Sequence, residues 1–157
     1  HKYLQEEKDE KIADHLMGTR QELKAVNKEI VVRAVRLTKE RASTLNELWS
    51  LCGYLFTPPI NYNEKTLKKI STALTVDILG ELSKKLDSVK SFKEIEISIT
   101  VKDWINESKR GFGSVMQPAR LALVGELKGV DLYVIFEFLG KEESMSRLGL
   151  LIDKIKA

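Results

Sequence analysis

Apolar positions along most of this 157-residue chain recur at intervals of three and four, with charged residues between them. That spacing places the apolar side chains on one face of a helix and the charged ones on the other. The pattern predicts helical segments over residues 6–17, 27–42, 44–56, 64–86, 116–124, 131–139 and 141–155. Within the fourth of these segments we expect a break near Thr72 or Thr75.

Several of these segments begin or end at residues that favour helix termini. Thr44 and Glu47 have the spacing of a capping box, in which the hydroxyl accepts a bond from the amide three residues on and the carboxylate reaches back. The run Thr57-Pro58-Pro59 predicts a loop over residues 57–63. The other terminus signals are Asn63 and Asp131 before helices and Gly18, Gly125 and Gly140 after them.

Residues 95–101 depart from the helical spacing. Ile95, Ile97, Ile99 and Val101 alternate with polar residues, which alone is typical of a strand. A lone strand would have no partner elsewhere in this chain. We therefore expect an irregular entry into a helix over about residues 100–108, with Trp104 and Ile105 turned inward.

Composition supports the same fold class. The chain is 43% hydrophobic and 31% charged, with 3 prolines and 9 glycines, which favours helices over β structures rich in turns. We expect an all-α fold, an irregular helical bundle in two packed lobes over residues 1–90 and 91–157. The 26 basic and 23 acidic residues leave a net charge of +3, which neither indicates nor excludes strong non-specific RNA binding.

The cysteine content and the first residues of the chain indicate in which cellular compartment the protein works. The lone cysteine, Cys52, lies in an apolar run, which predicts a buried thiol in a reducing environment. The sequence has neither an apolar stretch near the roughly 20 residues of a bilayer span nor the pattern of a signal peptide. We expect a cytoplasmic monomer that does not bind membranes. Because His1 and not Met comes first, we also expect a piece of something longer.

Candidate chemistry consists mainly of positive side chains. His15 is the only histidine away from the terminus, and no nucleophile with a base, carboxylate pair or metal cluster has convincing spacing, so we expect no metal site. The connector 109–114 is basic and contains glycine, and Arg33, Arg36 and Lys39 form a basic ridge. Arginine pairs with phosphates and stacks on bases, which suits unpaired RNA. The alternative is a helical protein-interaction module whose arginines make ordinary ion pairs.

Three motifs in the second half of the chain carry a family resemblance. They are Gly111-Phe-Gly-Ser-Val-Met-Gln-Pro-Ala-Arg-Leu-Ala-Leu-Val-Gly125, Asp131-Leu-Tyr-Val-Ile-Phe-Glu-Phe-Leu-Gly-Lys-Glu-Glu143 and Arg147-Leu148. Together these motifs resemble the carboxy-terminal anticodon-binding region of bacterial-type glutamyl-tRNA synthetases. In that family a segment ending in Ala-Leu-x-Gly precedes a helix ending in Leu-Gly-Lys-Glu. Earlier matches, also in order, are His1-Lys2-Tyr3-Leu4, Arg41-Ala-Ser-Thr-Leu45 and Gly53-Tyr-Leu-Phe-Thr57. The resemblance covers essentially the whole chain.

The resemblance implies a class I synthetase, in which a nucleotide-binding catalytic domain is followed by an all-helical region that grips the anticodon. The parent enzyme would use ATP with magnesium to attach glutamate to tRNA(Glu). No His-x-Gly-His or Lys-x-Ser-Lys type signature occurs in this sequence. The resemblance therefore implies that this chain binds tRNA(Glu), holds no cofactor and is inactive as an enzyme alone.

The resemblance also assigns anticodon-binding residues. Arg41 matches the family arginine that reads the third anticodon base, and Arg120 matches a second arginine at the anticodon. The turn 126–130 matches another anticodon-contacting loop, which adds Gly129 through its backbone and Leu132 beside it. The alternative for Arg41 is a helix-end arginine facing solvent. The alternative for Arg120 is a salt bridge that holds the two lobes together.

Phosphate contacts are predicted from local charge and not from a family motif. The stretch between Glu107 and Glu126 contains no acidic residue, and Lys109 and Arg110 stand in it. Lys128 follows in the next turn. Cations of this kind fix the position of a protein on the nucleic-acid backbone without reading its sequence.

Overall fold

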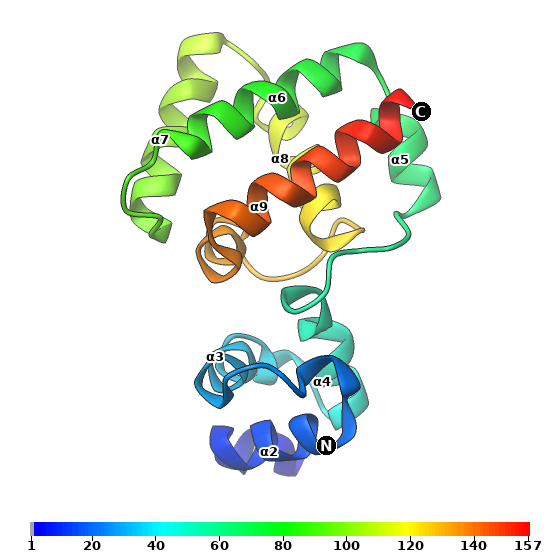
Figure 1. Cartoon of the computed structure of the whole chain (residues 1–157), viewed down its shortest axis with the longest axis vertical. Coiled ribbons are helices and arrows are strands. Elements are labelled where there is room, and N and C mark those ends of the chain that lie inside the picture. The colour runs from blue at the N-terminus through cyan, green and yellow to red at the C-terminus, as the bar shows by residue number, and fades with distance from the viewer. Residues whose placement is uncertain (1) are drawn as a thin grey trace. The chain divides into compact units, whose positions relative to one another are not determined.

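All regular secondary structure in the computed structural model, which describes residues 2–157, is helical (Figure 1). The predicted all-α class is confirmed. Contacts divide the chain into two compact units, of which the first ends at Thr57 and the second is Pro58–Ala157. Each unit is a helical bundle with its own buried apolar residues.

The division lies earlier in the chain than the sequence predicts. The expected boundary at residues 90 and 91 would leave the helix α6 (Ala73–Asp87) in the first lobe. In the structure α6 packs against the helices α8 (Phe112–Val124) and α9 (Leu132–Lys156) and is part of the second unit. The apolar face of α6 decides this, because Ile78, Leu79, Leu82 and Leu86 are buried there.

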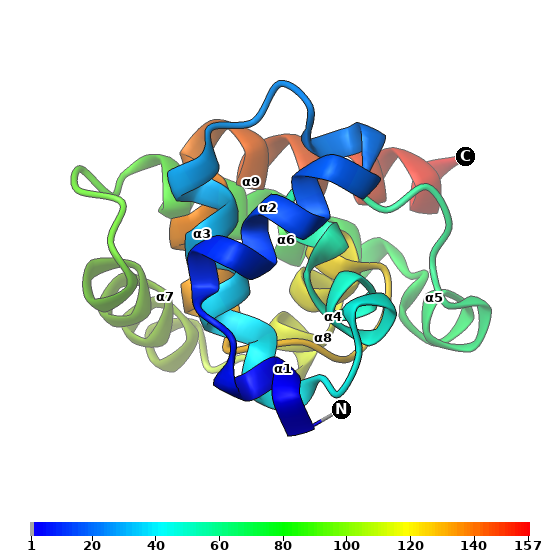
Figure 2. The ribbon, with the colours of Figure 1, turned by 90° about the horizontal axis from the view of Figure 1, so that it is seen from below.

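The first unit is built around two helices that lie against each other, α2 and α3 (Figure 2). Its elements are α1 (Lys2–Glu6), α2 (Asp9–Thr19), α3 (Lys28–Thr38) and α4 (Leu45–Cys52), with the short 3-10 helices η1 (Gln21–Leu23), η2 (Lys39–Arg41) and η3 (Gly53–Leu55). The core comprises Ile12, Leu16, Leu23, Val31, Val35 and Leu48. The predicted 6–17 helix starts later than expected, at Asp9, and Gly18 lies inside α2 and does not end it.

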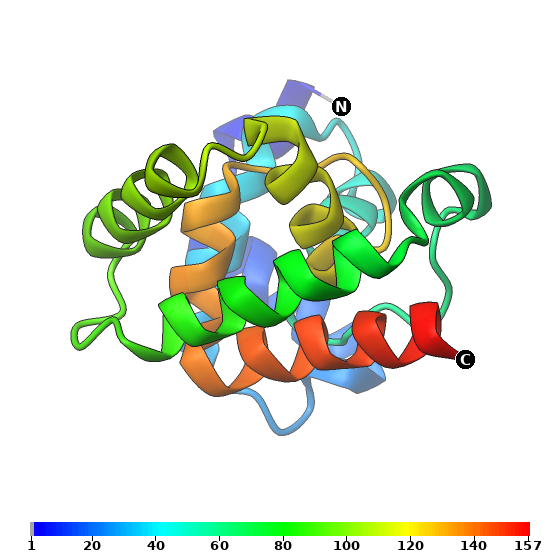
Figure 3. The same cartoon turned by 90° about the horizontal axis from the view of Figure 1, so that it is seen from above.

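The second unit is arranged around α9, which lies beside α6 along much of its length (Figure 3). The other helices of this unit are α5 (Glu64–Ile70), α7 (Glu94–Ser108) and α8. Gly140, with φ 83° and ψ 168°, interrupts the helical conformation inside α9. The predicted pair of segments, 131–139 and 141–155, therefore corresponds to the two arms of this bent helix.

The alternating segment 95–101 is helical throughout, so the expected irregular entry was wrong. Ile97 and Val101 are buried, while Ile95 and Ile99 are 74% and 56% exposed. Two residues four apart face inward and two others four apart face outward, so one helix produces the two-residue alternation. The inward face continues through the buried Trp104, which agrees with the sequence.

Most helix termini form at the predicted residues. Thr44 accepts a hydrogen bond from the amide of Glu47, whose carboxylate accepts one from the amide of Ser43. Asn63 and Asp131 cap α5 and α9 in the same way. The predicted break in the 64–86 segment also occurs. Its α6 half begins after the N-cap Thr72.

Candidate nucleic-acid interface

Arg41 is the last residue of η2 and is exposed. This 3-10 turn follows α3 directly, and its backbone is closed by a hydrogen bond from the amide of Ala42 to the carbonyl of Lys39, 3.1 Å long. Ala42 is buried, which anchors the residue next to Arg41. The exposed residue Arg41 thus belongs to a short turn that is closed by a backbone hydrogen bond and followed by a buried residue.

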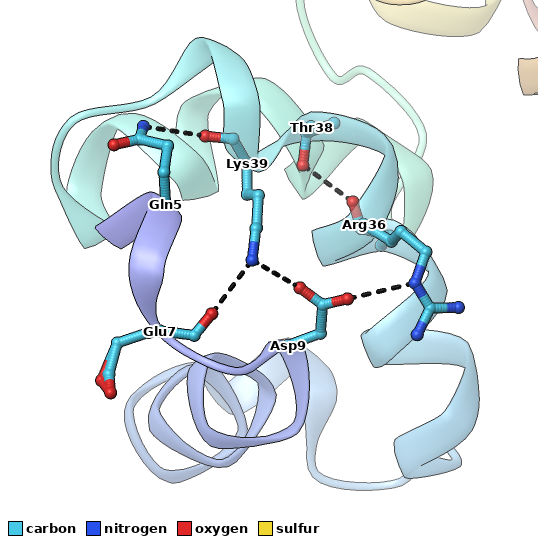
Figure 4. A network of polar contacts seen from close by, with 7 residues as sticks. Gln5, Glu7, Asp9, Arg36, Thr38 and Lys39 are labelled. Carbon is cyan, nitrogen blue, oxygen red and sulfur yellow. Dashed lines mark hydrogen bonds and ion pairs between the residues drawn. The ribbon is translucent and has the colours of Figure 1, made fainter. Parts of the chain in front are cut away.

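Side chains from the beginning of the chain hold this turn (Figure 4). The amide nitrogen Nε2 of Gln5 donates to the carbonyl of Lys39 over 3.2 Å and also to the carbonyl of Ala42. In the opposite direction, Nζ of Lys39 donates to the carbonyl of Glu7 at 3.0 Å and pairs with Oδ1 of Asp9 at 2.9 Å. The turn that carries Arg41 is therefore linked to α1 and to the start of α2.

Asp9 joins two cations of the predicted basic ridge to α2. Its Oδ2 accepts from Nε of Arg36 at 3.1 Å, while Oδ1 pairs with Lys39. The hydrogen bond from Lys39 is the largest influence on this carboxylate, and with Arg36 it lowers the pKa of Asp9 although burial acts in the opposite sense. Arg36 on α3 and Lys39 on η2 are thus both linked to the start of α2.

Arg120 lies on α8 and holds the turn that follows this helix. Its Nη1 donates to the carbonyls of Lys128 at 3.2 Å and Val130 at 2.8 Å. Between these two carbonyls lies Gly129, whose φ of 115° is in the left-handed region that favours glycine. Arg120 and the predicted contact loop are therefore one structural element within the second unit.

The other two residues that the sequence predicts at the anticodon, Gly129 and Leu132, differ in accessibility. Gly129 is partly exposed, which leaves its backbone within reach of a ligand. Leu132 is 2% exposed and begins α9 inside the core. Its side chain packs in the second unit and does not reach the surface, so the structure supports only an indirect role for it.

The three predicted phosphate contacts also differ. Lys109 caps the C-terminus of α7 in a left-handed conformation, with φ 58°, and its side chain is exposed. Nη2 of Arg110 bonds Oε2 of Glu81 on α6 at 2.5 Å, so its charge is already paired with a carboxylate. Lys128 is exposed and its Nζ lies 3.5 Å from Glu126. Lys109 and Lys128 are the better candidates.

The other two candidate groups of the sequence, Cys52 and His15, are not part of a binding site in the structure. Cys52 is buried as expected, and this burial raises the pKa of its thiol from 9.0 to about 12. His15 is exposed on α2. Within residues 2–157, the structure contains no group of three or more histidine, cysteine or acidic residues that could hold a metal ion. In the same described part, no helix combines the length and apolar character needed to cross a bilayer.

Sequence reasoning missed Gln5 and Asp9. Gln5 donates to carbonyls that are 34 and 37 residues further along the chain. Asp9 accepts from Arg36, which is 27 residues away. No local spacing reports such pairs. The only signal in the sequence is that Asp9 stands in the first turn of a predicted helix, where a carboxylate is favourable for other reasons.

Residues 5–152 match the model of a protein family described as the anticodon binding domain. The chain belongs to this family. The match spans both units, so the resemblance seen in the sequence is confirmed. Arg41, Arg120, Lys109 and Lys128 all lie within the matched residues.

The relatives are glutamate-tRNA ligases. The chain is 37% identical to the enzyme of Porphyromonas gingivalis over 154 residues, which cover 98% of this chain and 30% of that protein. It is 36% identical to the enzyme of Flavobacterium psychrophilum, with coverage of 94% and 30%. The chain thus spans about 30% of the length of the curated relatives that it matches.

Solved structures agree with this relationship. A glutamate tRNA ligase from Elizabethkingia meningosepticum, crystallised in complex with its amino acid, superposes with a TM-score of 0.86 at 31% identity. The similarity covers 98% of this chain and 31% of that one. The glutamate-tRNA synthetase of Elizabethkingia anophelis gives a TM-score of 0.79, also at 31% identity, with coverage of 97% and 30%.

Proposed function

We propose that this chain is the carboxy-terminal anticodon-recognition region of a glutamate-tRNA ligase and that it binds the anticodon loop of tRNA(Glu). The observation that carries the proposal is the match of nearly the whole chain to the anticodon binding domain family, together with relatives that are glutamate-tRNA ligases. In the longer protein, a separate catalytic domain would use ATP with magnesium to attach glutamate to the tRNA in the cytoplasm.

Arg41 is the residue that we assign to the third anticodon base. A guanidinium has five donors in a planar fork and no acceptor, which suits the acceptor edge of an unstacked cytosine. A guanine at this position would present a different pattern, with two donor groups and one acceptor on its Watson–Crick edge, and its donors would stay unpaired against the same fork. The exposed position of Arg41 at the end of η2 supports this role.

Arg120 acts at a second point of the anticodon through the turn that it holds. Because Nη1 is occupied by the carbonyls of Lys128 and Val130, the shape of the 128–130 turn depends on this side chain. Gly129 then offers its backbone to a base, and Lys128 and Lys109 contact phosphates. These contacts make binding dependent on salt, since each neutralised phosphate releases counterions.

The test is binding of the chain to an anticodon stem-loop of tRNA(Glu) and to the same loop with the third anticodon base changed from cytosine to guanine. We expect a clear preference for the cognate loop, and weaker binding to both loops as salt rises. Arg41→Gln should remove the preference. Arg33→Gln is the matched control, because it removes the same charge from an exposed position of α3.

Two outcomes would contradict the proposal. Equal, weak binding to both loops by the unchanged chain would indicate a basic surface without sequence recognition. A preference that survives Arg41→Gln would remove this arginine from the reading role, while leaving anticodon binding itself in place.

A further inference from the structure

Arg41 stands on a turn that has little stability of its own. A 3-10 helix of three residues, such as η2, has one backbone hydrogen bond with weaker geometry than an α-helix. An exposed arginine also has many rotamers, so the location of its backbone sets where the guanidinium can reach. Contacts from outside the turn therefore decide how well Arg41 is placed.

Gln5 supplies such a contact on both sides of Arg41. One side-chain amide nitrogen has two hydrogens, and here it donates to the carbonyl of Lys39 and to the carbonyl of Ala42. These carbonyls belong to the first residue of η2 and to the residue just after Arg41. Gln5 thus spans the whole turn and limits its opening. Figure 4 shows the bond to Lys39.

Asp9 holds the same turn through Lys39. The ammonium of Lys39 is fixed between the carboxylate of Asp9 and the carbonyl of Glu7, at 2.9 and 3.0 Å. The side chains of Asp9 and Lys39 are only 17% and 15% exposed, so water competes weakly with this pair. Because Lys39 is the first residue of η2, its side chain ties the beginning of the turn to the start of α2.

We propose that Gln5 and Asp9 are positioning residues for Arg41, which set how well the chain discriminates the third anticodon base without touching the RNA. This role rests on the proposed function, because the position of Arg41 matters only if this arginine reads the base. Hydrogen bonds weaken steeply with distance and angle, and binding groups must be held within about 0.5 Å of the productive geometry. A looser turn then lowers affinity for the cognate base more than affinity for the wrong one.

The experiment compares Gln5→Met with the unchanged chain. Methionine has nearly the length of glutamine but no donor, so both bonds across the turn are lost. We expect the preference for the cognate over the changed stem-loop to fall by about three- to tenfold, as for the loss of one or two neutral hydrogen bonds. Binding to the changed loop should stay within about twofold, since the phosphate contacts remain.

Matched variants separate positioning from general stability. Gln21→Met makes the same change in η1, on an exposed residue of the same unit, and should leave the preference unchanged. Asp9→Asn acts on the turn from its other side, and should lower the preference in the same direction as Gln5→Met. If Gln5→Met does not fold, Asp9→Asn alone tests the positioning role. The double variant Gln5→Met with Arg41→Gln should discriminate no worse than Arg41→Gln alone, because residues that act through one group are not additive.

The outcomes distinguish this inference from the proposed function. If Arg41→Gln removes the preference but neither Gln5→Met nor Asp9→Asn lowers it, the positioning role is overturned and the reading role stands. If these variants weaken binding to both loops equally, together with the unfolding midpoint, they serve stability only, which also overturns the inference. If Arg41→Gln itself has no effect on the preference, the proposed role of Arg41 fails first.

Discussion

Nη1 of Arg120 donates a hydrogen bond to the carbonyl oxygen of Val130, ten residues further along the chain, at 2.8 Å. The same nitrogen reaches the carbonyl of Lys128 at 3.2 Å. One side chain on α8 therefore shapes the connection to α9. A residue expected to touch the anticodon is at the same time a structural part of the loop expected to touch it.

Replacing Arg120 with Ala should destabilise the second unit by about 1–3 kcal/mol, because two carbonyls lose a charged donor. We expect the variant to remain folded and to bind the anticodon stem-loop more weakly. Urea unfolding and stem-loop binding measure the two effects. Lys128→Ala is the control for the stability measurement alone, since replacing an exposed lysine should change stability by about 0.5 kcal/mol or less.

Loss of binding by Arg120→Ala with unchanged stability would show that Arg120 contacts RNA directly and that its bonds to the turn contribute little. Loss of the unfolding transition would instead identify Arg120 as essential to the fold.

Gly125 is predicted to tolerate no side chain. Its φ is 92°, and an added Cβ would lie 2.9 Å from Cβ of Pro59 and 3.1 Å from the carbonyl oxygen of Asn61. Gly125→Ala should therefore lower the free energy of unfolding by about 1–3 kcal/mol. Gly80→Ala is the opposite control, because Gly80 lies inside α6 with open space around it, and should stabilise by about 0.5–1 kcal/mol. Equal effects of the two changes in a urea titration would contradict this account.

The helices could be predicted because their signals are local. The caps Thr44, Asn63 and Asp131 each bond to amides two or three residues away, so the sequence contains both partners within one turn. The α7 segment was misread for the same reason. Alternation over 95–101 fits a strand and a helix with two inward positions, and only the packing against α9 distinguishes them.

The candidate site was less accessible to such reasoning. Arg41 and Arg120 came from the family resemblance, and their charge alone would not separate them from Arg36 or Arg110, which pair with Asp9 and Glu81. The unit boundary and the bracing of η2 depend on contacts between distant residues. Local spacing contains no information on which distant carbonyl Gln5 will meet.

Arg147 should be among the most sensitive residues of the second unit. It is 1% exposed, and it donates to Oε2 of Glu143 and to the carbonyl of Leu123, both at 2.8 Å. Burial lowers the pKa of Arg147, and the bond to Glu143 opposes that effect. Arg147→Ala should cost about 3–5 kcal/mol, because it leaves a cavity and an unpaired carbonyl at the end of α8.

Glu143→Gln is the companion variant to Arg147→Ala. The side chain of Glu143 is 42% exposed, so solvent screens its charge and an amide oxygen can still accept the bond. We expect a much smaller loss in urea unfolding than for Arg147→Ala. Similar losses for the two variants would mean that the ion pair within α9 accounts for most of the effect of Arg147, and that the bond from Arg147 to Leu123 on α8 contributes little.

The carboxylate of Asp9 makes part of the free energy of unfolding of the first unit depend on pH. Lys39, through a hydrogen bond, and Arg36 hold the pKa of Asp9 below its ordinary value of 3.8. A group with a lowered folded-state pKa stabilises fully above the unfolded pKa and loses that contribution as pH falls through the folded value. Protonation of Asp9 removes the negative charge that pairs with Lys39 and Arg36, and so weakens the link. The difference in unfolding free energy between the unchanged chain and Asp9→Asn should be constant near pH 6 and shrink below about pH 4.

The other carboxylates are the same in both proteins, so their contributions cancel in this difference. A difference that stays the same at about pH 3, or grows there, would mean that the ion pairs of Asp9 do not stabilise the fold.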